Sequence, residues 1–247
     1  MTSDRQTAYR KTATVSTGRI GLIALFVTAL VTAQLTASKL LGFAVPVSLP
    51  VAGDLLVLPG AALAYALTFF ASDCYSELYG PSEAHKMVNV GFVMNFVLLA
   101  LVWSTILAPA APFSPIDPAS FERVLGASTN IVVASLLAYL VSQNWDVFVF
   151  HRLREWTDGE HLWARNVGST ATSQLLDTAI FVVVGFGVVP AVLGTGQPQA
   201  VGELLALIVG QYVLKLAIAL VDTPFVYAVV GLARSRGRFG IAARTAD

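Results

Sequence analysis

The stretch "TSQLLDTAIF", Thr172 to Phe181, places a glutamine and an aspartate inside an otherwise apolar run of the chain. Thirty-one residues earlier, "VSQNWDVFVF", Val141 to Phe150, repeats the pattern SQxxDxx[V/I]F. In a helix, a Gln and an Asp three positions apart project to the same side. The repeat therefore predicts two helices that each present an amide beside a carboxylate.

The composition around this repeat is typical of a membrane protein. Of the 247 residues, 56% are hydrophobic and 12% are charged, and the mean hydropathy is +0.72, whereas soluble domains are about a quarter charged. The formal net charge is zero without a long basic run, which argues against a nucleic-acid partner. A single cysteine, Cys74, excludes an internal disulfide, and three scattered histidines lack metal-ligand spacing. We expect no metal and no cofactor.

Six stretches of the chain are long and apolar enough to cross a bilayer, which takes about 20 residues per helix. Only helices or closed barrels satisfy the backbone in lipid, and runs of this length select helices. The sequence predicts an all-α polytopic membrane protein, with one transmembrane domain at 20–232 between an N-terminal tail at 1–19 and a basic C-terminal tail at 233–247. The six predicted transmembrane helices are 20–42, 54–76, 87–109, 128–150, 167–190 and 203–232.

The basic residues indicate how these helices are oriented. With six spans the two termini share one side, and twelve of the fifteen Lys and Arg residues fall on that side. The opposite side carries only Arg123, while Lys39 and Lys215 lie within spans. By the positive-inside rule, both termini are expected in the cytoplasm and the protein in the cell membrane. Successive spans run in opposite directions, so the two SQxxD copies are related as inverted repeats are in many transporters.

Ionisable residues within the spans define a candidate site. Each costs about 2.5–3.5 kcal/mol at the centre of a spanning helix unless it is paired, neutralised or hydrated. Asp177 lies near the middle of its span, whereas Asp146 is close to the cytoplasmic end. Amides, carboxylates and neighbouring aromatic rings together suit a flat polar ring. A purely structural salt bridge between Asp177 and Lys215 is the main alternative. The candidate substrate-binding residues are Gln143, Trp145, Asp146, Gln174, Asp177, Phe181, Gln211 and Lys215.

Four blocks of the sequence resemble the family of queuosine precursor transporters, also described as putative vitamin uptake transporters. The resemblance runs from the first span to about Tyr227, nearly the whole membrane domain. The blocks are "FFASDCYSELYGPSEAHKMVNVGF" (69–92), "LLAYLVSQNWDVFVFHRLREWT" (136–157), "LWARNVGSTATSQLLDTAIF" (162–181) and "KLAIALVDTPFVY" (215–227).

This resemblance implies a transporter, not an enzyme, with no catalytic residue. It implies import of a free 7-deazaguanine base, such as 7-cyano-7-deazaguanine, that serves tRNA modification. A guanine-type edge offers two adjacent N–H donors that one carboxylate can accept. We therefore expect Asp177 to accept both donors, Gln174 and Gln143 to bind the rest of the edge, and Trp145 or Phe181 to stack on the ring.

Two other functions fit parts of the sequence. A substrate-binding subunit of an energy-coupling-factor vitamin importer also has six spans, and Ala29, Ala33 and Ala37 would let a partner helix approach closely. Its ATPase module would be another subunit, because no GxxxxGK[ST] loop occurs here. An intramembrane aspartyl protease could use Asp146 and Asp177 as a carboxylate pair. The GxGD pattern expected of such a protease is absent.

Overall fold

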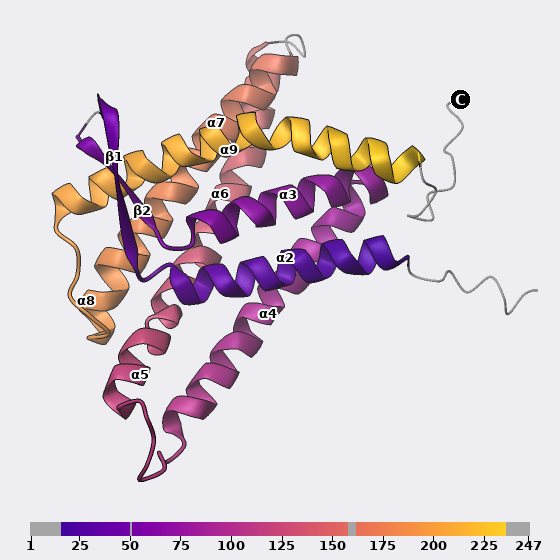
Figure 1. Cartoon of the computed structure of the whole chain (residues 1–247). Helices are drawn as coiled ribbons and strands as arrows, with labels where there is room; N and C mark the ends of the chain where they lie inside the picture. The colour runs from indigo at the N-terminus through magenta and orange to yellow at the C-terminus, as the bar shows by residue number, and fades with distance from the viewer. Residues whose placement is uncertain (1–15, 50, 158–161, 236–247) are drawn as a thin grey trace, which may run out of the picture.

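The structure, a computed structural model, describes residues 16–49, 51–157 and 162–235 and shows a set of long helices with one β-hairpin (Figure 1). The predicted tails 1–19 and 233–247 lie largely outside the described residues. The elements are α2 (Thr17–Thr36), β1 (Leu40–Leu49), β2 (Gly53–Pro59), α3 (Ala62–Tyr79), α4 (Pro81–Leu107), α5 (Pro118–Gly126), α6 (Ser128–Trp156), α7 (Leu162–Val182), the π-helix η1 (Val183–Val188), α8 (Val189–Leu193) and α9 (Val201–Ser235).

Five helical segments of the described chain are long and apolar enough to cross a membrane. They confirm the prediction of a helical, multi-pass membrane protein. The helix α3, where the second span is predicted, has 18 residues and carries Asp73 and Glu77, and it is not one of the five. Six spans and two cytoplasmic termini stay predictions. The five segments are Thr17–Thr36, Pro81–Leu107, Pro118–Trp156, Val167–Leu193 and Val201–Ala233.

The predicted end of the first span and the predicted start of the second span are wrong. Instead of helix up to residue 42 and again from residue 54, the structure has the antiparallel hairpin β1–β2, paired from Leu40 with Pro59 to Leu49 with Gly53. Pro46 lies within β1, and a proline inside a helix costs about 3 kcal/mol. The hairpin residues are as apolar as a spanning helix, so hydropathy alone does not separate the two structures.

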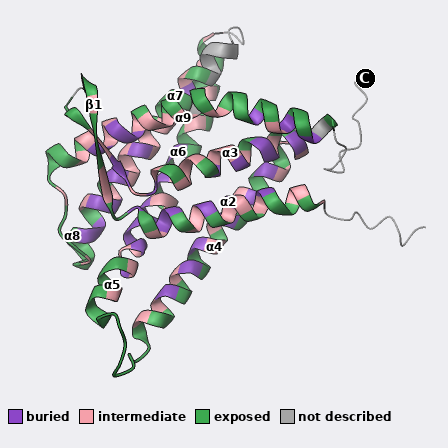
Figure 2. Cartoon of the chain, in the orientation of Figure 1, coloured by how far each residue is buried: buried purple, intermediate pink, exposed green. Residues whose placement is uncertain are grey.

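The outer surface of the helices is apolar, as contact with lipid requires. Large hydrophobic side chains such as Leu63, Leu101 and Leu220 are 77%, 63% and 78% exposed. The buried residues lie on the faces that the helices turn toward one another (Figure 2). A soluble domain would not leave such residues along the whole length of its helices, so the exposure pattern agrees with a membrane environment.

The alanine stripe of α2 packs inside the chain. Ala29, Ala33 and Ala37 are 5%, 4% and 0% exposed, and Ala33 and Ala37 share one hydrophobic cluster with Ala61 and Ile131. Small residues here let α3 and the neighbouring helices approach α2 closely. The stripe therefore packs within this chain, so these alanines no longer support a partner helix of an energy-coupling-factor importer.

A polar cluster holds three helices together at the basic end of the molecule. Arg19 at the start of α2 donates from Nε to the Tyr75 hydroxyl of α3 at 2.8 Å and forms an ion pair with Glu83 of α4. Glu83 also pairs with Lys86 at 2.5 Å. Gly80 separates α3 from α4 at φ 91°, a backbone conformation that favours glycine. The block "SELYGPSEAHK" thus forms the turn and the ion pairs that anchor this end.

Helix α9 approaches the hairpin so closely that only glycine fits at the contact. A Cβ added to Gly210 would collide with the carbonyl oxygen of Val57 in β2, whereas a Cβ on Gly202, in the same helix, would meet nothing within 4 Å. The clash involves backbone and not the end of a flexible side chain, so one element must shift. This contact fixes the first half of α9 against β2.

The glycine contact gives a stability prediction with a matched control. We expect Gly210→Ala to lower the stability of the purified protein by about 1–3 kcal/mol, the range for overpacking, measured as a fall in Tm in detergent. Gly202→Ala should hold or raise Tm, because alanine favours a helix by about 1 kcal/mol over glycine. Equal Tm values for the two variants would contradict the tight contact.

Candidate functional site

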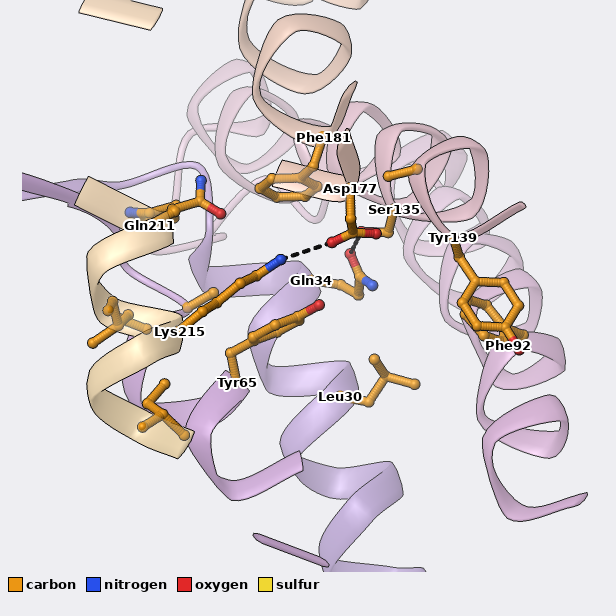
Figure 3. Close-up of a pocket in the computed structure, with 16 residues that line it drawn as sticks. Leu30, Gln34, Tyr65, Phe92, Ser135, Tyr139, Asp177, Phe181, Gln211 and Lys215 are labelled. Atoms are coloured by element: carbon orange, nitrogen blue, oxygen red, sulfur yellow. Dashed lines mark hydrogen bonds and ion pairs between the residues drawn. The ribbon is translucent and has the colours of Figure 1, made fainter. Parts of the chain in front are cut away.

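A cavity lies at the centre of the helices, and its walls come from α2, α3, α4, α6, α7 and α9. We call it the central cavity. Its volume is about 120 Å³, well below the roughly 300–1,000 Å³ of sites for drug-sized ligands, so an occupant must be small. The polar side chains on its wall are Gln34, Tyr65, Ser135, Tyr139, Asp177, Gln211 and Lys215 (Figure 3).

An ion pair between α7 and α9 forms the charged part of the wall. Lys215 Nζ lies 2.8 Å from Asp177 Oδ2, and the two side chains are 10% and 18% exposed. The ammonium also lies 5.9 Å from the centre of the Tyr65 ring, within the range of a cation–π contact. The predicted alternative of a salt bridge is therefore present in the structure. It lies on the cavity wall, so a structural pair and a binding site are not mutually exclusive here.

The serines of the two SQxxD copies make crossed hydrogen bonds between α6 and α7. Ser142 Oγ, in the first copy, lies 3.3 Å from Asp177 Oδ1 of the second and equally far from the carbonyl oxygen of Tyr139, so its one proton is shared between these two acceptors. Ser173 Oγ, in the second copy, lies 3.1 Å from Asp146 Oδ1 of the first and equally far from the carbonyl oxygen of Thr170. Both serines are buried, at 5% and 7% exposure. Each copy thus supplies the donor for the other copy's carboxylate, a role that was not predicted although both serines belong to the repeated motif.

The eight predicted site residues separate into three groups. Asp177, Phe181, Gln211 and Lys215 line the central cavity. Gln174 lines a neighbouring cavity together with Lys215. The remaining three are not on either wall: Gln143 and Trp145 are exposed on α6, and Asp146 accepts the hydrogen bond from Ser173.

In the second copy of the motif, Gln174 and Asp177 line different cavities, because two residues three positions apart point about 60° apart around a helix. Two residues on the same side of a helix therefore need not belong to the same binding site.

Two glutamine side chains on the cavity wall differ in their hydrogen bonding. Gln34, 3% exposed, accepts from Ser135 Oγ at 3.5 Å. Gln211 is 9% exposed and its Nε2 is buried without a hydrogen-bond partner in the described part of the chain. A buried N–H group without an acceptor costs about 1–3 kcal/mol. Gln211 also lines the central cavity, so its amide is a candidate partner for a polar atom of a ligand.

Aromatic side chains complete the wall, and sequence reasoning missed most of them. Phe181 was predicted, whereas Tyr65, Phe92 and Tyr139 were not. The rings of Phe92 and Tyr139 lie 4.1 Å apart between centres, on helices α4 and α6 that are distant in sequence. Aromatic residues occur on every predicted span, so nothing in the sequence distinguishes these three. Flat rings around a small cavity favour a flat ligand.

The two aspartates do not form the carboxylate pair of an aspartyl protease. Such a pair shares one proton between adjacent carboxyl groups. Here Asp177 is paired with Lys215 and accepts from Ser142, while Asp146 accepts from Ser173. Each carboxylate thus contacts its own partner, and no hydrogen bond joins the two carboxyl groups in the described residues.

Comparison with known proteins identifies relatives over most of the helical region. The model of the putative vitamin uptake transporter family matches residues 59–229. A protein of Bacillus subtilis named "Probable queuosine precursor transporter" is 36% identical over 166 residues, which cover 66% of this chain and 68% of that protein. One of the same name from Haemophilus influenzae is 29% identical over 127 residues, half of each chain. No solved structure matches the chain.

Proposed function

The chain belongs to the putative vitamin uptake transporter family, and on this premise we propose that its central cavity binds a free 7-deazaguanine base, a queuosine precursor, during import. As a member, it is a multi-pass transporter of the cell membrane and not an enzyme. The observation that carries the proposal is the Asp177–Lys215 pair on the wall of a small cavity with aromatic sides. The ligand class comes from the names of the two relatives.

Asp177 has acceptor capacity left after its contacts with the protein. An ionised carboxylate offers about four lone-pair positions, of which Lys215 uses one on Oδ2 and Ser142 uses one on Oδ1. One position therefore remains on each oxygen. Two adjacent N–H donors, as on the edge of a guanine-type ring, fit one acceptor on each oxygen. The ligand can bind Asp177 while the ion pair is still closed.

Other side chains of the cavity wall suit the ligand atoms that lie beside these two N–H donors. The free Nε2 donor of Gln211 matches a ring carbonyl, which only accepts. Tyr65 and Phe181, on α3 and α7, line the cavity and offer faces for stacking. A ring without these donors and acceptors would leave buried polar groups unpaired, which is how such sites reject analogues.

The orientation in the membrane belongs to the same proposal. The basic ends of α2, α4, α6 and α9 are expected to face the cytoplasm by the positive-inside rule. The hairpin and the start of α9 then lie toward the outside, and the central cavity lies between the two. Import corresponds to movement of the base toward the basic end.

Uptake by a strain that neither makes nor imports the precursor tests the function, with two glutamine variants as a matched pair. We expect radiolabelled 7-deazaguanine base to accumulate only when this gene is expressed. Gln211→Ala should weaken binding about tenfold, the effect of one lost hydrogen bond to a buried partner. Gln143→Ala should bind like wild type, because Gln143 is exposed. Absence of uptake with a well-expressed protein would reject the ligand class.

A further inference from the structure

Three cavities follow one another along α3 and α9, which we call the α3–α9 seam. A further cavity of about 520 Å³ lies against the same two helices outside this series, and Asp222 also lines it. Beyond the central cavity lies a second of about 510 Å³, which we call the middle cavity, and then a third of about 280 Å³, the basic-end cavity. Along α3 their walls pass from Tyr65 to Phe69 and Asp73 and then to Glu77. The α9 residues on the three walls also move along the sequence from one cavity to the next, beginning with Gln211 in the central cavity. The cavities therefore form a series from the site to the basic end.

Lys215 separates the first two cavities of this series. Its side chain lines both the central and the middle cavity, and its ammonium is held on the central side by Asp177 at 2.8 Å. Both later cavities are larger than the central one, and Lys215 lies where the central cavity meets the middle cavity. A ligand that moves along the seam must pass this side chain, which requires the ion pair to open.

An opened ion pair leaves an ammonium that needs a new anion, because an unpaired charge between membrane helices is costly. The middle cavity supplies carboxylates from both sides of the seam, Asp73 on α3 and Asp222 on α9. Asp222 Oδ2 is buried and has no hydrogen-bond partner in the described residues. Asp222 lies seven residues after Lys215, two turns further along the same face of α9. The ammonium therefore has a second place on the far side of the barrier.

Helix α9 can bend near this second place. Its first half is fixed by the contact of Gly210 with Val57. Pro224 lies inside the helix and has no N–H to donate to the carbonyl of Leu220, one turn earlier. Prolines of this kind are the usual positions of helix kinks. The part of α9 after Pro224, which borders the basic-end cavity, is thus the part that can move against the rest of the helix.

We propose that the α3–α9 seam is the exit route of the transported base, and that Lys215 is its gate, exchanging Asp177 for the carboxylates of the middle cavity when the base passes. The inference rests on the proposed function of the central cavity. In this proposal Asp222 affects the rate of transport and not the binding of the base. Binding at Asp177 and release past Lys215 are then separate steps with separate residues.

Thiol accessibility tests the route, with two leucines of α9 as probe and control. Leu216 lines the middle cavity, whereas Leu220, one turn later, is the more exposed at 78% against 53% but lies on none of the three cavity walls. In a Cys74→Ala background, Leu216→Cys in inside-out vesicles should react with a membrane-impermeant maleimide at least tenfold faster than Leu220→Cys. Saturating 7-deazaguanine base should slow the reaction. Equal rates would mean that the middle cavity is a lipid-filled groove and would overturn the route.

Asp222 variants test the gate. We expect Asp222→Asn to bind the base within twofold of wild type and to import it at least tenfold more slowly, and Asp222→Glu to restore most of the uptake. Wild-type uptake by Asp222→Asn would overturn the role of Asp222. Failure of wild-type protein to bind any 7-deazaguanine base would instead reject the proposed function, and this outcome is distinct because thiol reactivity without ligand does not depend on it.

Discussion

Replacing Asp177 by asparagine is expected to reduce binding of the 7-deazaguanine base by at least a hundredfold and to abolish uptake at micromolar concentrations. The carboxylate is proposed to accept two N–H donors at once. An asparagine has one carbonyl oxygen and one NH₂ group in its place, so one ligand donor would face another donor. Loss of one partner of a buried, charged hydrogen bond costs about 2–5 kcal/mol, and a hundredfold corresponds to about 2.7 kcal/mol.

Equilibrium binding to purified protein in detergent measures this effect without the transport cycle. Asp146→Asn is the matched control, because Asp146 is the equivalent carboxylate of the other SQxxD copy and is not on the central cavity wall. It should keep its affinity within a few-fold of wild type. If Asp177→Asn bound as well as wild type, Asp177 would not be the recognition group, whatever its role in uptake.

The Lys215→Met variant is expected to cause the largest loss of stability among single changes to the cavity wall. Methionine keeps much of the apolar stem and removes the ammonium, so Asp177 keeps a charge with only the Ser142 hydroxyl beside it. Breaking a fully buried pair in this way costs about 3–5 kcal/mol. The pair here is 10% and 18% exposed, and hydration of the cavity brings the expected cost to the lower end of that range.

Removal of both charges should then cost less than removal of Lys215 alone. In the Asp177→Asn, Lys215→Met double variant no unpaired charge is left, and contacting residues typically show coupling energies of about 0.5–3 kcal/mol. Thermal unfolding of wild type, both single variants and the double variant in one detergent gives this coupling energy. Losses that simply add would mean that the two side chains stabilise the protein independently of each other.

The sequence predicted the helical membrane fold well, because that prediction depends on composition and on run length. It failed at residues 40–59, where the chain folds as a hairpin. Hydropathy sums side-chain polarity over a window and carries no information about backbone conformation. Pro46 and Gly53 are local indications against helix, and they fall in the interval 43–53 that the prediction leaves between two spans.

The candidate site was predicted in part for a related reason. A charge within a spanning helix must be paired or hydrated wherever it lies, so Asp177 and Lys215 could be selected from the sequence without knowledge of the packing. For Tyr65 and Gln143 the sequence does not decide whether the side chain faces the cavity. Tyrosine and glutamine tolerate many environments, and which of them faces a cavity is decided by the rotation of each helix against its neighbours. That rotation is a property of the packed structure and not of the local sequence.

The contacts between the serines and aspartates of α6 and α7 limit how these two helices can move during transport. Ser142 with Asp177 and Ser173 with Asp146 join the same two antiparallel helices at two levels. A slide of α7 along α6 offsets both contacts by the same distance. We therefore expect α6 and α7 to move as one unit during transport, while α9 moves against them.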